Sequence, residues 1–219
     1  MRPRATTALY QTTARAWLTL AALALLLPVR WRLGLWLPLH LALAGAVSTA
    51  ISGAMQNFMH ALTASPEPPG WTVRVQYALL VTGVAAIAVG MPAGVPWLTG
   101  AGGTAFTAAM ALLGWMLWRS RRRSLHRRHG VPMFAYAAAV AFVLLGATLG
   151  ALMGGQVAAG ELYVHFRYAH MTVNVLGWAA LTVVGTMITF LPTVLRVRMP
   201  ATRGRAPVAL LVAGLLVQL

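Results

Sequence analysis

The sequence has 219 residues, of which 59% are apolar and only 9% are charged, and its mean hydropathy is +0.74. Its 17 basic residues are all arginines and its two acidic residues are glutamates, so the formal net charge is +15. Soluble domains carry about 25% charged residues, so this composition excludes an ordinary soluble protein. The lack of cysteine excludes disulfides, zinc–thiolate sites and cysteine catalysis. A multi-pass membrane protein is the class that remains.

Long uncharged stretches between the arginines predict the membrane-spanning helices, because a spanning helix needs about 20 apolar residues. The pattern indicates an all-α, polytopic bundle of six helices and the start of a seventh near Pro207. We place the six helices near residues 9–30, 34–62, 74–91, 96–118, 132–155 and 166–196. Only 14 residues follow Arg205, which is too few to cross comfortably. We therefore expect residues 1–219 to form a single transmembrane domain from the N-terminal part of a longer chain.

The first predicted helix has a second interpretation. Arg2, Arg4 and Arg15 precede a run of 14 uncharged residues, as in a signal peptide. No small-x-small cleavage site follows that run; the sequence continues as Pro-Val-Arg-Trp-Arg over residues 28–32. We favour an uncleaved first helix over a signal peptide.

The arginines predict the orientation of the chain. With a cytoplasmic N-terminus, the inner loops and ends hold 14 arginines and the outer loops hold three. This predicts a multi-pass protein of a bacterial inner membrane. The densest cluster, Arg119–Arg128, is then a topology anchor that contacts anionic lipids. A nucleic-acid-binding role for this cluster is disfavoured because it lies between two apolar spans.

Carboxylates are missing from the predicted spans, because Glu67 and Glu161 lie in loops or at helix ends. Ion-coupled transporters usually keep carboxylates at membrane depth, so a proton-coupled carrier is disfavoured. The chain also lacks an aspartate that could orient a catalytic histidine, which disfavours a membrane hydrolase.

Two histidines are the best candidates for chemistry. His40 and His170 each lie a few residues inside the outer end of a predicted helix, so they are expected at similar depth. Neutral imidazole is a common ligand of haem iron and copper. His170 shares a helix face with Asn174, Gly177 and Gly185, which would let a flat macrocycle or another helix approach closely. The alternative is that each histidine makes a hydrogen bond across a helix interface.

A weaker metal candidate and a packing pattern lie nearby. Glu161 and His165 are four residues apart and share a helix face, so they could hold a metal. An aromatic belt at the outer interface explains the same segment and is the favoured interpretation. The spacing of four between Gly146, Gly150 and Gly154 predicts tight helix packing.

A weak internal repeat has an offset of 132 residues. The matched pairs are Gly45 with Gly177, Gly53 with Gly185, Met55 with Met187 and Phe58 with Phe190. The alignment places His170 opposite Pro38, which argues against a symmetric site made by His40 and His170.

Residues 170–199 and 40–62 resemble the membrane part of uncharacterised bacterial proteins that are distantly similar to haem–copper oxidase subunit I and to the NnrS family of nitric-oxide-response membrane proteins. Subunit I is built from repeated four-helix units, which fits the offset of the repeat. The resemblance implies that His40, together with His170, ligates haem b or copper. It also implies a cupredoxin-type redox partner or downstream domain, since some relatives continue into one.

The chain departs from that resemblance in its motifs. It has no His-Pro-Glu-Val segment, no adjacent histidine pair and no His-x-x-x-Tyr sequence. An oxygen-reducing, proton-pumping centre is therefore not expected. We expect a haem- or copper-binding module for electron transfer or gas response. The alternative is a scaffold or carrier for a neutral or hydrophobic ligand that binds no cofactor.

Overall fold

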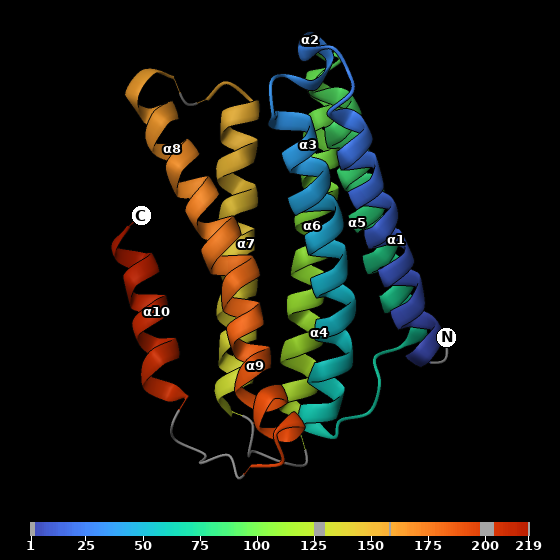
Figure 1. Ribbon diagram of the computed structural model, residues 1–219, viewed down its shortest axis with the longest axis vertical. Helices are drawn as coiled ribbons and strands as arrows, with labels where there is room; N and C mark the ends of the chain where they lie inside the picture. Colours follow the sequence, from blue (N-terminus) through green and yellow to red (C-terminus); the bar gives the residue numbers. More distant parts are fainter. Residues whose placement is uncertain (1–2, 125–129, 158, 198–203, 219) are drawn as a thin grey trace.

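A computed structural model describes residues 3–124, 130–157, 159–197 and 204–218, and these form an all-α bundle (Figure 1). Seven helical rods run roughly along one axis. The second rod joins α3, the π-helical segment η1 and α4 end to end, and the sixth joins α8, the π-helical segment η2 and α9. The element bounds are α1 Pro3–Ala24, α2 Val29–Arg32, α3 Trp36–His40, η1 Leu41–Val47, α4 Ser48–Thr63, α5 Gly70–Gly90, α6 Pro96–Arg122, α7 Gly130–Gly154, α8 Gly160–Thr172, η2 Val173–Ala180, α9 Leu181–Val194 and α10 Arg205–Val217.

Within the described residues, five helices are long and apolar enough to cross a membrane. They are Val29–Thr63, Gly70–Gly90, Pro96–Arg122, Gly130–Gly154 and Gly160–Val194. Large apolar side chains cover their outer surfaces, as expected for contact with lipid; Val89, for example, is 60% exposed. The prediction of an all-α, multi-pass membrane protein is thereby confirmed.

The predicted ends of two helices are wrong. The first helix was expected to reach residue 30 but ends at Ala24. Pro28 lacks an N–H group and disfavours helical geometry at Leu27, so the chain turns there and starts the short helix α2. The sixth helix was expected from residue 166 but begins at Gly160. Glu161 in its first turn interacts favourably with the positive end of the helix dipole.

Arginine-bearing segments separate to opposite ends of the bundle. Figure 1 places the start of α1, the end of α6 and the start of α10 at one end, and α2 and the start of α8 at the other. We call the first of these the arginine-rich end. Arg127 and Arg128 of the predicted lipid-binding cluster lie outside the described residues. Which end faces the cytoplasm stays a prediction from the arginine distribution.

The hairpin of α5 and α6 packs backbone against backbone. A Cβ atom built at Gly83 would lie 2.7 Å from the main-chain nitrogen of Phe106. One built at Gly102 would lie 2.8 Å from both the carbonyl oxygen of Gly83 and the nitrogen of Ile87. The turn between the helices contains Pro92 and Gly94, as the sequence predicts, and Gly94 has a φ of +65°.

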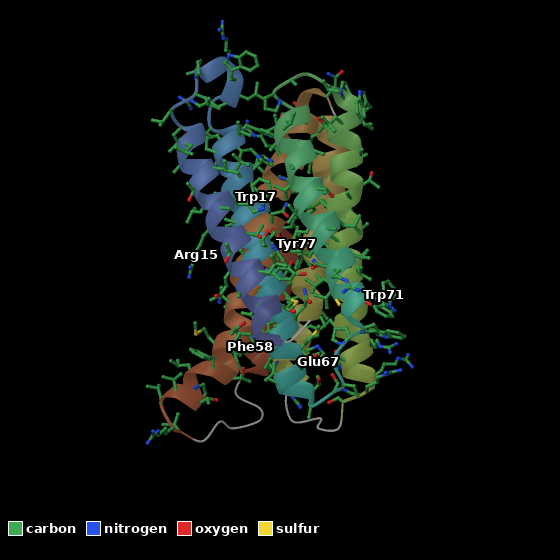
Figure 2. All side chains as sticks on the ribbon, turned by 90° about the vertical axis from the view of Figure 1, so that its right-hand side faces the viewer. Arg15, Trp17, Phe58, Glu67, Trp71 and Tyr77 are labelled. Atoms are coloured by element: carbon green, nitrogen blue, oxygen red, sulfur yellow. The ribbon has the colours of Figure 1, made fainter. Side chains whose placement is uncertain are left out.

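Helices α1, α4 and α5 are joined by buried polar side chains. The hydroxyl of Tyr10 donates to Oε1 of Gln76 at 2.5 Å and accepts a hydrogen bond from Nε2 of Gln56 at 3.0 Å. Close by, the hydroxyls of Thr13 and Tyr77 are 2.6 Å apart. In Figure 2 Tyr77 points into the bundle whereas Arg15, on the same helix as Tyr10, points away from it. These bonds fix the packing of the three helices because unpaired polar groups are costly inside a membrane.

The internal repeat is visible in the three-dimensional structure. The π-helical segments η1 and η2 begin at Leu41 and Val173, which are 132 residues apart. A Cβ atom at Gly53 would meet the ring of Tyr10 on α1, and one at Gly185 would meet the ring of Tyr136 on α7. In both helix pairs, α1/α4 and α7/α9, a glycine of the repeat thus lies against a tyrosine of the neighbouring helix.

Side chains at equivalent positions of the repeat also meet where the second rod faces the sixth rod. The rings of Phe58 and Phe190 contact each other edge to face, with centroids 6.4 Å apart. Trp178 donates a hydrogen bond of 3.1 Å from its indole nitrogen to the hydroxyl of Ser48. The second and sixth rods thus face each other through side chains, an arrangement that decides where the histidines lie.

Candidate histidine site between the second and sixth rods

The structure brings His40 and His170 together. His40 is the last residue of α3, and His170 lies in the last turn of α8. Their ring centroids are 6.3 Å apart and the ring planes differ by only 18°. Both side chains are half-buried in the bundle. The two histidines stay out of register in the repeat, so the argument against a symmetric site stands as a prediction, but the two rods face each other and the rings still meet.

The ring of His40 is fixed by its own helix. Its Nδ1 atom lies 2.8 Å from the main-chain oxygen of Trp36, one turn earlier. The indole of Trp36 stacks on the imidazole, with centroids 4.0 Å apart and an interplanar angle of 22°. The hydrogen bond and the stacking together fix both the position and the rotation of the ring.

The ring of His170 is fixed by the neighbouring helix α7. Its Nδ1 atom lies 2.7 Å from the main-chain oxygen of Gly146. The amide nitrogen of Asn174 lies 3.3 Å from the same Nδ1 atom and donates to the main-chain oxygen of His170 at 2.7 Å. Asn174, which was predicted to share the site, thus braces the last turn of α8.

These contacts define which ring nitrogen is available to a ligand. A main-chain oxygen only accepts hydrogen bonds, so Nδ1 of both His40 and His170 must carry the proton. The lone pair then lies on Nε2, and neither Nε2 atom has a hydrogen-bond partner among the described residues. Histidines that bind metals usually show this pattern, with the second nitrogen donating to a carbonyl or carboxylate.

The distance between the two ring centres can be compared with that of two imidazoles on one metal ion. Metal–imidazole bonds are about 2 Å long, and each ring centre lies about 1 Å behind its nitrogen. An ion midway between two opposed nitrogens would therefore separate the ring centres by about 6 Å. The ring centres of His40 and His170 are 6.3 Å apart, and their planes are nearly parallel in a stacked arrangement.

Most of the predicted glycines make close helix contacts, of which those of Gly146 and Gly150 lie at the histidine pair. A Cβ atom at Gly150 would lie 3.0 Å from Cε1 of His170, and one at Gly146 would lie 2.3 Å from Nδ2 of Asn174. At Gly177 a Cβ atom would meet the side chain of Phe142 at 2.6 Å, and at Gly185 the Cβ of Ala135 at 2.8 Å. Gly154, which was predicted with them, has open space within 4 Å.

The second candidate, Glu161 with His165, lies in exposed helix surface. Nδ1 of His165 is 2.8 Å from the main-chain oxygen of Glu161, not from its carboxylate. Arg167 lies over the ring of Tyr168 at 5.6 Å, as in an interfacial aromatic belt. In the described parts of the chain, no group of three or more histidine, cysteine, aspartate or glutamate side chains could hold a metal ion. A metal at Glu161 and His165 stays a prediction.

Two partners of the site were missed by sequence reasoning. Trp36 is four residues before His40, so its stacking position was readable from helical spacing. The main-chain oxygen of Gly146 has no side-chain signal and depends on how α7 packs against α8. A glycine at that position allows the close approach, and the predicted glycine spacing pointed to the right helix.

The fold and the site define a multi-pass α-helical membrane protein with one pair of facing histidines among its described residues. The sequence matches no protein-family model, no curated protein and no solved structure. The resemblance to haem–copper oxidase subunit I and the NnrS family therefore stays a prediction.

Proposed function

We propose that the protein is a haem b-binding membrane module for electron transfer or gas response, in which His40 and His170 would hold the haem. The observation that carries this proposal is the approach of two parallel imidazole rings from different rods, each with its Nδ1 bonded to a main-chain oxygen. It agrees with the arrangement that the family resemblance implies.

The donor set fits haem better than copper. Copper sites usually draw three or more nitrogen or sulfur ligands from the protein. Only His40 and His170 meet here, and the chain has no cysteine. A haem brings four equatorial nitrogens of its own, so two imidazoles complete the coordination of its iron. Copper is therefore the second choice of cofactor.

Each residue of the site has a distinct part in this proposal. His40 and His170 would present Nε2 to the iron, while the main-chain oxygens of Trp36 and Gly146 hold the rings in the required tautomer. Gly150 leaves room for the ring of His170. The haem would supply one-electron or gas-binding chemistry.

Titration of the detergent-purified protein with hemin tests the proposal directly. We expect saturation at one equivalent and the visible spectrum of six-coordinate, low-spin haem, because two neutral imidazoles lie within bridging distance. Imidazole at millimolar concentration should leave this spectrum unchanged. Binding without a defined stoichiometry, or a five-coordinate spectrum, would contradict the proposal.

A larger residue at Gly150 should disturb the site selectively. The Gly150→Leu substitution places side-chain atoms where His170 now lies, since even a Cβ atom would be 3.0 Å from Cε1 of the ring. We expect the affinity for hemin to fall at least tenfold. Gly154→Leu is the matched control, because it makes the same change one turn away in open space. Equal affinities of the two variants would show that His170 is not a ligand.

A scaffold or carrier for a neutral or hydrophobic ligand is the second candidate function. One observation favours it: the hydrogen bond from Nδ1 of His170 to Gly146 already joins α8 to α7 without a cofactor. In that case replacing His170 should lower the melting temperature of a haem-free protein. If instead the melting temperature of the wild-type protein rises when hemin is added, the haem-binding proposal is supported.

A further inference from the structure

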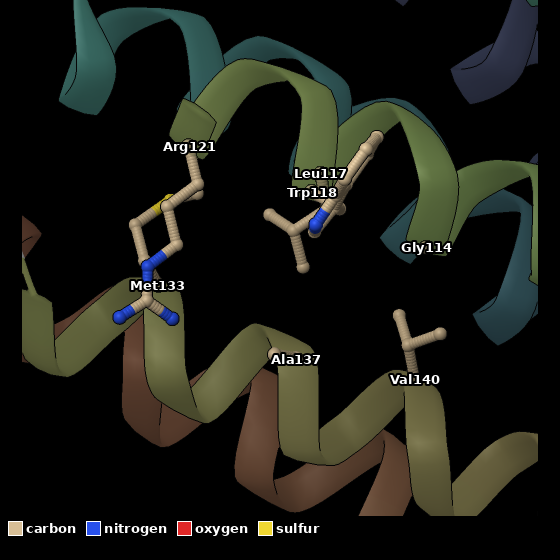
Figure 3. A pocket seen from close by; sticks show the side chains of 7 residues that line it. All are labelled: Gly114, Leu117, Trp118, Arg121, Met133, Ala137 and Val140. Atoms are coloured by element: carbon tan, nitrogen blue, oxygen red, sulfur yellow. The ribbon is translucent and has the colours of Figure 1, made fainter. Parts of the chain in front are cut away.

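A hollow between α6 and α7 lies away from the histidine site, with a volume of about 150 Å³ (Figure 3). Arg121 and Trp118 on α6, and Met133 and Ala137 on α7, line it at the arginine-rich end of the bundle. Gly114 and Val140 close its other end. This hollow belongs to neither the histidine pair nor the glycine contacts around it.

The hollow is a groove with one polar end. Gly114 precedes Arg121 by seven residues, which is about 10 Å along an α-helix. The long axis of the groove therefore follows the helices, from Arg121 at the membrane surface toward the middle of the span. Apart from Arg121, its lining is apolar or formed by the flat ring of Trp118. An apolar chain with a polar head at one end matches this shape.

Arg121 has no counter-charge among the residues that the structure describes. The whole chain has only Glu67 and Glu161 as acidic residues, and no ion pair links Arg121 to either of them. Arg121 is exposed at the end of a helix long and apolar enough to span a membrane. A phosphate oxygen accepts charge-assisted hydrogen bonds from guanidinium, and anionic headgroups lie at this depth.

We propose that this groove binds one anionic phospholipid molecule. Its phosphate bonds to the guanidinium of Arg121, and one acyl chain lies along the groove past Ala137 toward Gly114. Gly114 and Ala137, which add little bulk, line the groove together with Trp118 near the headgroup end. This inference is independent of the haem proposal, because none of the groove residues contacts His40 or His170.

Native mass spectrometry of the full chain, released from detergent, tests the proposal. The probes are dioleoyl phosphatidylglycerol and dioleoyl phosphatidylcholine, added at equal concentration. Arg121→Gln removes the phosphate contact, and Ala137→Leu fills the groove while keeping every arginine. Ala137 is exposed on the surface of α7, so leucine there leaves the packing of the helices intact.

Two matched controls separate the groove from diffuse attraction. Arg119→Gln makes the same change of charge on α6, at an arginine that lies over Trp115 and outside the groove. Ala141→Leu makes the same change of size one turn along α7, at another exposed position that does not line the groove.

We expect one tightly retained phosphatidylglycerol in the wild-type protein and in both controls. Arg121→Gln and Ala137→Leu should each weaken its retention about fivefold or more, and phosphatidylcholine should not replace it. Equal weakening by Arg119→Gln and Arg121→Gln would show general charge attraction and overturn the proposal. Unchanged retention in Ala137→Leu, or equal retention of the two lipids, would overturn it as well.

Discussion

Replacing His40 or His170 by alanine is expected to reduce the haem content of the purified protein to background. Each substitution removes one of the two histidines proposed to hold the haem, and among the described residues no group of three or more histidine, cysteine, aspartate or glutamate side chains could hold a metal ion instead. Haem content is measured from the pyridine haemochrome of protein produced in haem-replete cells. Membrane insertion should persist, because the span around each residue keeps its length and its apolar surface.

His165→Ala is the matched control for these variants. His165 lies on α8 with His170, but it is exposed and its Nδ1 bonds only to the main-chain oxygen of Glu161. This variant should keep its haem. Wild-type haem content in both His40→Ala and His170→Ala would refute the assignment of the ligands.

The Gly102→Ala substitution should cause a large loss of stability for the addition of a single methyl group. A Cβ atom at this position would lie 2.8 Å from two main-chain atoms of α5, and backbone atoms cannot move aside as a side chain can. Overpacking of this kind costs about 1–3 kcal/mol. Thermal unfolding in detergent, followed by circular dichroism, should therefore show a lower melting temperature.

Gly103→Ala provides the comparison at the next residue. A Cβ atom there meets nothing within 4 Å, and alanine has the higher helix propensity. This variant should melt at the wild-type temperature or slightly above it. If the two alanine variants melted at the same temperature, the close packing of α5 against α6 would be wrong.

The membrane spans could be predicted from the sequence because a long uncharged stretch between arginines is a strong and local pattern. Gaps between charges located five apolar helices, and Pro92 with Gly94 marked the turn between two of them. The positions of the helix ends were harder to predict. The first helix stops at Ala24 although the apolar run continues through Leu27, because Pro28 disfavours helix in the residue before it.

Only part of the candidate histidine site could be predicted from the sequence. The depth of His40 and His170 follows from their distance to the predicted helix ends, and the structure places them together. The π-helical segments Leu41–Val47 and Val173–Ala180, which follow the two histidines along the chain, were not predicted. A π-helical turn holds more residues than an α-helical turn, so it rotates the helix faces that follow it. No residue pattern in these two segments predicts such a turn.

The internal repeat shows both the use and the limit of sequence comparison. Its offset predicted the paired positions of Gly53 with Gly185 and of Phe58 with Phe190, and these glycines pack alike while the phenylalanines touch. The same offset did not predict that the histidines meet. Side chains that project from two opposed rods can meet although they are two residues out of register.

A reduced-minus-oxidised visible spectrum of the detergent-purified protein, with metal analysis of the same sample, tests the central claim most directly. The account predicts sharp haem b bands, one iron per chain and no stoichiometric copper, since two imidazoles suffice for haem iron and not for copper. A featureless spectrum and a metal-free sample from haem-replete cells would contradict the account, and would leave His40 and His170 as interhelical packing residues.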